Sequence, residues 1–266
     1  MKHRFPGKCA VFVWVGFAVL ALAAPISTRA QGRGGRGPAG PPRSPQAAAP
    51  IDLTGYWVSL VTEDWRWRMV TPPKGDYASV PLNPEGRRVA DTWDPAKDEA
   101  AGNQCKAYGA AAIMRVPTRL HITWDNENTL RIDTDAGTQT RQLHFGPPQP
   151  PSGEAGWQGY SAAEWQMVGG GGRGGRGSAP PEGGSLKVET THMKPGYLRK
   201  NGVPYSANTK VTEYLDRTNE PDGNSYLIVT TLVEDPQYLQ QPFITSTHFK
   251  KEADATRWHP SPCEAK

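Results

Sequence analysis

Residues 119–145 read RLHITWDNENTLRIDTDAGTQTRQLHF, and apolar side chains recur there at every second position. The alternation is interrupted by Asn126-Glu127-Asn128 and again by Asp135-Ala136-Gly137, which are typical turn residues. A period of two indicates a strand with one buried face. The stretch therefore predicts three antiparallel strands joined by short turns.

The same alternation continues further along the chain, over residues 186–190, 209–217, 225–233 and 244–250. Only Pro84 to Asp94 suggests a helix, because proline suits the first helical turn. We expect residues 51–266 to form a single all-β domain, an antiparallel up-and-down barrel of about eight to ten strands with one short helix. Closure of the barrel would leave no exposed strand edge.

The first thirty residues have the parts of a secretory signal peptide. Lys2, Arg4 and Lys8 supply positive charge at the start. An apolar run follows over residues 10–24, and Thr28-Arg29-Ala30 provides a small-residue site for cleavage after Ala30. We therefore expect a periplasmic or secreted protein. No stretch reaches the roughly 18 apolar residues of a spanning helix, so no membrane span is expected.

Two stretches are rich in glycine and arginine. Residues 31–50 contain no apolar side chain larger than alanine or proline, so they cannot bury enough surface to offset chain entropy. We expect a disordered tether there. The string GRGGRG recurs at 172–177, within residues 169–184, where it predicts a flexible insertion between two strands.

The net positive charge of the chain comes from its expected signal peptide. The formal net charge is +4, from 30 basic and 26 acidic residues. Four of the basic residues and no acid lie in residues 1–30, so the remainder is neutral. Because a surface that binds nucleic acid needs an excess of positive charge, no nucleic-acid partner is expected.

Cys105 and Cys263 are the cysteines that remain after the expected signal peptide, which contains Cys9. In an oxidising compartment such a pair favours a structural disulfide, with two separate thiols as the alternative. The histidines make no pair at the spacing of a zinc helix, and no Cys-x-x-Cys occurs. We expect no metal site and no cofactor.

The strand expected to open the barrel contains Gly55-Tyr56-Trp57. Glycine allows close approach of the backbone, and the indole of Trp57 can fill the barrel floor. This Gly-x-Trp step resembles the opening strand of lipocalin-like, or calycin, barrels.

A second resemblance covers the C-terminal part of the chain. It is similar to a family of uncharacterised exported proteins of soil bacteria such as acidobacteria. The resemblance implies a fold and no established activity. The matching features are Trp165, the strand Leu186-Lys187-Val188-Glu189-Thr190, Glu213, and Asp235-Pro236 with Tyr238 and Pro242.

Residues 63–69, EDWRWRM, combine two tryptophans with two arginines. As a strand, the segment would present its tryptophans on one face and its arginines on the other. One interpretation is a ligand-binding wall, with an aromatic surface and an arginine fork for a carboxylate or phosphate. The other is a core strand with solvated arginines. The candidate ligand-binding residues, with a loop tyrosine at the expected barrel mouth, are Trp65, Arg66, Trp67, Arg68 and Tyr238.

Glu213 is the acid that alternation places most clearly inside the barrel, because it shares a face with Val211 and Leu215. A buried carboxylate needs a partner, and Arg66 or Arg141 would be suitable. Burial would raise the pKa of Glu213 and suit it to general acid or base catalysis. The alternative is an internal ion pair that only fixes the barrel.

Two functions of different classes follow. The first is an exported barrel that binds a small apolar or amphipathic molecule, or a partner protein, at its mouth without catalysis. The second is a barrel enzyme of the isomerase, cyclase or hydrolase type, with Glu213 as acid or base and an arginine that stabilises an anion. No Gly-x-Ser-x-Gly or Ser-x-x-Lys motif occurs, so whether the protein is an enzyme stays open. A third option is a structural protein without a pocket.

Overall fold

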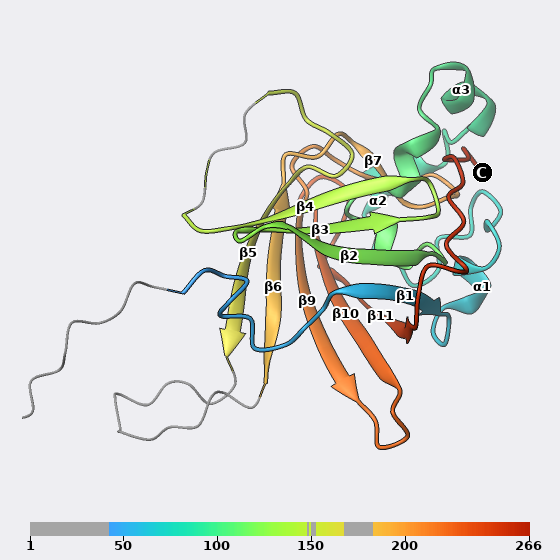
Figure 1. The fold of residues 1–266 in the computed structure, drawn as a ribbon. Helices are drawn as coiled ribbons and strands as arrows, with labels where there is room; N and C mark the ends of the chain where they lie inside the picture. The colour runs from blue at the N-terminus through green and yellow to red at the C-terminus, as the bar shows by residue number, and fades with distance from the viewer. Residues whose placement is uncertain (1–42, 148, 150–152, 168–182) are drawn as a thin grey trace, which may run out of the picture. The chain divides into compact units, whose positions relative to one another are not determined.

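The computed structural model of the chain describes residues 43–147, 149, 153–167 and 183–266. Within these residues, strands predominate and nine of them close into a barrel (Figure 1). The expected closed β-barrel is confirmed, in a described chain that is mostly rather than entirely β. The nine barrel strands are β1 (Gly55–Leu60), β2 (Arg119–Asn126), β3 (Thr129–Thr134), β4 (Gln139–Phe145), β5 (Tyr160–Met167), β6 (Gly184–Thr191), β9 (Lys210–Asn219), β10 (Ser225–Glu234) and β11 (Phe243–Glu252).

Around the barrel the strand order is β1-β11-β10-β9-β6-β5-β4-β3-β2, and β1 and β2 pair to close it. The predicted meander of residues 119–145 corresponds to β2, β3 and β4. A separate two-stranded sheet, β7 (Gly196–Arg199) with β8 (Val203–Tyr205), lies between β6 and β9 in the chain.

The sheet is mixed, and the expectation of antiparallel pairing throughout is wrong. β4 and β5 run parallel, with Leu143 opposite Ser161 and Phe145 opposite Ala163. Parallel neighbours need a connection long enough to return the chain to the same end of the sheet, and residues 146–159 provide it. A period of two reveals a strand but not its direction, so the sequence pattern could not show this pairing.

The described chain has more helix than the single short one expected. The predicted helix of residues 84–94 is α2 (Pro84–Ala90), and α3 (Pro95–Ala100) follows it. The two are separate because Asp94 is extended before a proline, and its side chain accepts hydrogen bonds from the first turn of α3. The remaining helical segments are α1 (Trp65–Arg68) and the 3₁₀ helices η1 (Gln104–Tyr108) and η2 (Ile113–Arg115).

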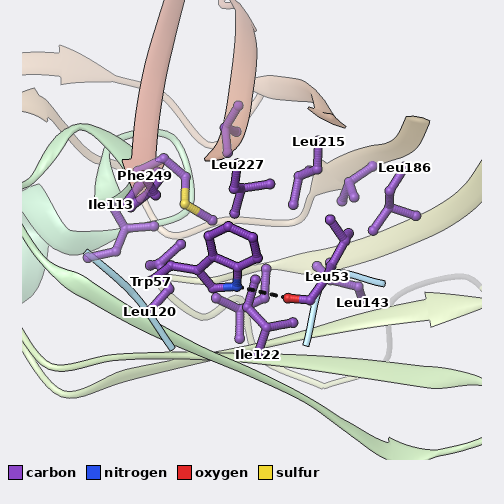
Figure 2. Packing of buried hydrophobic residues seen from close by; sticks show 14 of the residues in the cluster. Leu53, Trp57, Ile113, Leu120, Ile122, Leu143, Leu186, Leu215, Leu227 and Phe249 are labelled. Carbon is purple, nitrogen blue, oxygen red and sulfur yellow. Dashed lines mark hydrogen bonds between the residues drawn. The ribbon is translucent and has the colours of Figure 1, made fainter. Parts of the chain in front are cut away.

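Apolar side chains fill the barrel around Trp57, as Figure 2 shows. Trp57 has no exposed surface, and its indole Nε1 donates to the carbonyl of Leu53 at 2.9 Å. Protein interiors are close-packed, because each contact between neighbouring atoms adds a small attraction. This part of the barrel is therefore a packed core. The inward side chains around the indole include Leu120, Ile122, Leu143, Leu186, Leu215, Leu227 and Phe249.

Residues 43–50, which belong to the expected tether, contact the barrel. The indole Nε1 of Trp165 donates to the carbonyl of Pro45 at 2.9 Å, and the Gln46 amide donates to the carbonyl of Glu127 at 3.2 Å. The segment docks through its backbone, which composition does not reveal. The expected signal peptide, residues 31–42 of the tether and residues 169–182 of the predicted insertion lie outside the described residues.

Candidate functional site

A pocket of about 270 Å³ lies beside α1, at the end of the barrel where β1 ends and β2 begins. Figure 1 shows that α1 and the C-terminus occupy this end. The pocket wall combines aromatic, aliphatic and cationic side chains from segments far apart in the sequence. Its lining includes Trp67, Arg68, Met69, Val70, Tyr108, Arg115, Val116, Leu198, Arg199, Lys200, Pro262 and Glu264.

The segment expected as a strand at residues 63–69 forms the turn of helix α1 instead. The carbonyl of Asp64 accepts from the amides of Trp67 at 2.9 Å and Arg68 at 3.1 Å. Side chains in a helical turn do not alternate between two faces. As a result Trp67 and Arg68 line the pocket, whereas Trp65, which is 66% exposed, and Arg66 lie outside it.

Two buried arginines of the pocket wall are held by acids. Arg68 pairs with Glu63 and donates through Nε to the backbone carbonyl of Arg115 at 2.9 Å. Arg115 pairs through Nη2 with Asp64 at 2.8 Å. Burial lowers the pKa of Arg68, and the charge of Glu63 opposes this effect. Each cation is therefore fixed in place by a carboxylate.

Arg199 is the third buried arginine, and its partners are neutral. Its Nη2 donates to the hydroxyl of Ser79 at 2.9 Å, and its guanidinium lies over the ring of Trp67, 5.0 Å from the centroid. Burial, followed by repulsion from Arg115, lowers the pKa of Arg199 to about 10. The group stays protonated at neutral pH. It is a buried cation without a carboxylate within ion-pair distance among the described residues.

The C-terminal segment forms one side of the pocket, and the predicted Cys105–Cys263 disulfide is confirmed. The amide of Ser261 donates to the carbonyl of Asp135 at 2.8 Å, and the hydroxyl of Thr138 donates to the carbonyl of Ser261 at 2.9 Å. The hydrogen bonds attach residues 261–264 to the barrel end, and the disulfide attaches them to η1. The wall is therefore anchored covalently.

Glu213 lies inside the barrel, away from this pocket. Its carboxylate is 1% exposed and accepts two hydrogen bonds from Arg141, at 2.5 and 3.1 Å. Arg141 was one of the two expected partners; Arg66, the other, pairs with Asp76. Arg141 also donates to the hydroxyl of Thr190 at 3.3 Å. A polar layer thus crosses the barrel next to the core around Trp57.

Tyr238 is not part of the pocket either. Its backbone carbonyl accepts from Asn83 at the start of α2, and its hydroxyl accepts from Gln237. Of the five residues predicted to bind a ligand, the structure therefore brings only Trp67 and Arg68 together.

Arg115 and Arg199 were missed by the sequence analysis. Each is a lone arginine, and the two are far apart in the chain. One feature of the sequence could have pointed to Arg115, because it directly follows the apolar run AAAIM of residues 110–114. In the structure Arg115 is buried together with this run. A charged residue inside an apolar run is rarely buried without a specific reason.

A wider hollow of about 630 Å³ lies near His144 and Tyr160. Its lining is known only in part, because the structure does not describe every residue of this segment of the chain, so the hollow supports no site here. Among the described residues, no group of three or more His, Cys, Asp or Glu side chains could hold a metal ion, and no helix is long and apolar enough to cross a membrane.

No protein-family model matches the chain, and no curated protein matches it.

Proposed function

We propose that this protein binds a small amphipathic molecule in the pocket beside α1 and catalyses no reaction on it. The observation that carries this proposal is the composition of the pocket wall. Apolar surface from Trp67, Met69 and Val70 faces the same space as the buried cations Arg115 and Arg199. Binding pockets characteristically combine apolar surface with a few fixed polar groups, and in this pocket polar and apolar atoms contribute to the wall about equally.

The size of the pocket limits the ligand. A volume of about 270 Å³ is just below the range of about 300–1,000 Å³ found for most ligand pockets. A molecule with one or two rings and a single polar head would fit. Trp67, Met69 and Val70 supply apolar surface for such a body.

The enzyme alternative has less support. Glu213 is 1% exposed and does not line the pocket beside α1. A general acid or base must reach its substrate directly or through one water. The Arg141–Glu213 pair is better accounted for as an internal ion pair of the barrel.

The same proposal includes a periplasmic or secreted location and a lipocalin-like barrel. The Cys105–Cys263 disulfide supports an oxidising environment such as a periplasm. A barrel that begins with Gly55 and an inward Trp57 supports a lipocalin-like ancestry, with the parallel pairing of β4 and β5 as a departure from the up-and-down arrangement.

Replacing Trp67 with alanine tests the pocket. We expect 2-naphthoate, 2-naphthamide or both to bind the unmodified protein, and Trp67→Ala to weaken binding at least about tenfold, because an aromatic wall is lost. Isothermal titration calorimetry measures this. Trp65→Ala is the matched control, since that side chain lies two residues away and outside the pocket wall. Failure of both compounds to bind, or equal weakening by the two substitutions, would contradict the proposal.

A further inference from the structure

We propose that the pocket holds its ligand by a carboxylate that lies between Arg115 and Arg199. The ligand class is then a small, flat monocarboxylate. This inference rests on the function proposed above and specifies the polar head of the molecule.

Unused hydrogen-bond donors on both arginines point to this head. Nη1 of Arg115 and both Nε and Nη1 of Arg199 are buried and have no hydrogen-bond partner within the described part of the chain. The two residues are 7% and 5% exposed and line the same pocket. Buried donors of folded proteins are normally satisfied, because an unsatisfied group loses its bonds to water without replacement. The two guanidinium groups therefore retain donor capacity that the described residues do not use.

The charges around the pocket favour an anion. Arg68 and Arg115 each have a carboxylate partner, and Arg66 outside the pocket has Asp76. Arg199 has the hydroxyl of Ser79 and the face of Trp67 as its direct partners, and the more distant charges of Asp64 and Asp76 only partly offset its burial. A negative group placed here would offset the uncompensated charge of Arg199 and its repulsion from Arg115.

The amount of uncompensated charge favours a monoanion. Lys200 also lines the pocket, with Nζ 5.0 Å from the ring centroid of Tyr108, but Glu264 on the same wall has the opposite charge. Arg199 and Lys200 are then the lining cations without an ion pair among the described residues, and Glu264 offsets one of these two charges. A carboxylate has this single charge, whereas a phosphate monoester has close to two at neutral pH.

Comparison of 2-naphthoate with 2-naphthamide tests the proposal, because the two share a body and differ in charge. In the unmodified protein we expect naphthoate to bind at least about tenfold more tightly by isothermal titration calorimetry. Arg199→Gln should remove most of this preference and leave naphthamide binding little changed. Arg88→Gln removes one positive charge from the exposed face of α2, where it pairs with Glu85, and should leave the preference intact.

Each outcome separates the two proposals. Equal affinity of the two compounds in the unmodified protein overturns the carboxylate and leaves the binding function standing. A preference that survives Arg199→Gln in a folded variant also overturns it. If neither compound binds, the proposed function itself fails, and this inference fails with it. Should Arg199→Gln not fold, the affinity ratio in the unmodified protein still decides.

Discussion

Replacement of Glu213 by alanine is expected to lower the free energy of unfolding by about 3–5 kcal/mol. The substitution leaves the guanidinium of Arg141, 1% exposed, inside the barrel without its carboxylate partner. A buried charge without a partner has lost its hydration and has no ion pair inside the protein to replace it. Urea denaturation of the purified protein measures the change.

Two further variants give this prediction its controls. Glu164→Ala breaks an exposed pair with Lys187, in which Glu164 is 63% exposed, and should change stability by less than about 1 kcal/mol. The double substitution Arg141→Met and Glu213→Leu removes both charges and should recover most of the loss. If Glu213→Ala were no more damaging than Glu164→Ala, the ion pair would not be buried as described.

Removing the disulfide is the second change with a large expected effect. Cys105→Ser combined with Cys263→Ser removes a cross-link between residues 158 positions apart in the sequence and should cost about 2–5 kcal/mol, mainly because the unfolded chain gains freedom. It also frees the wall of residues 261–264, so 2-naphthoate should bind more weakly. Urea denaturation and calorimetry measure the two effects.

A reductant provides the matched control for the disulfide. Dithiothreitol should lower the denaturation midpoint of the unmodified protein towards that of the double variant and should not affect the variant. Equal midpoints for the unmodified protein and the variant, both without reductant, would show that the disulfide does not stabilise the fold.

The strands and the internal ion pair could be predicted from the sequence, because both follow from side chains that alternate between the two faces of a strand. Leu215 and Val211 place Glu213 inside β9, and Leu143 places Arg141 inside β4 by the same rule. The parallel pairing of β4 with β5 could not be predicted, since alternation within a strand does not reveal the direction of its neighbour.

The pocket could be predicted from the sequence only in part. Trp67 and Arg68 stood out by composition, but their geometry depends on a helical turn too short to leave a periodic pattern. Arg115 and Arg199 come together only through the three-dimensional fold. The docking of residues 43–50 depends on backbone carbonyls, which every sequence contains.

A crystal structure of the protein soaked with 2-naphthoate tests the central claim most directly. We predict the naphthalene ring against Trp67, in the pocket beside α1, and the carboxylate within hydrogen-bonding distance of the guanidinium groups of Arg115 and Arg199. Density for naphthoate elsewhere, with this pocket free of it at a concentration that saturates binding in solution, would contradict the account.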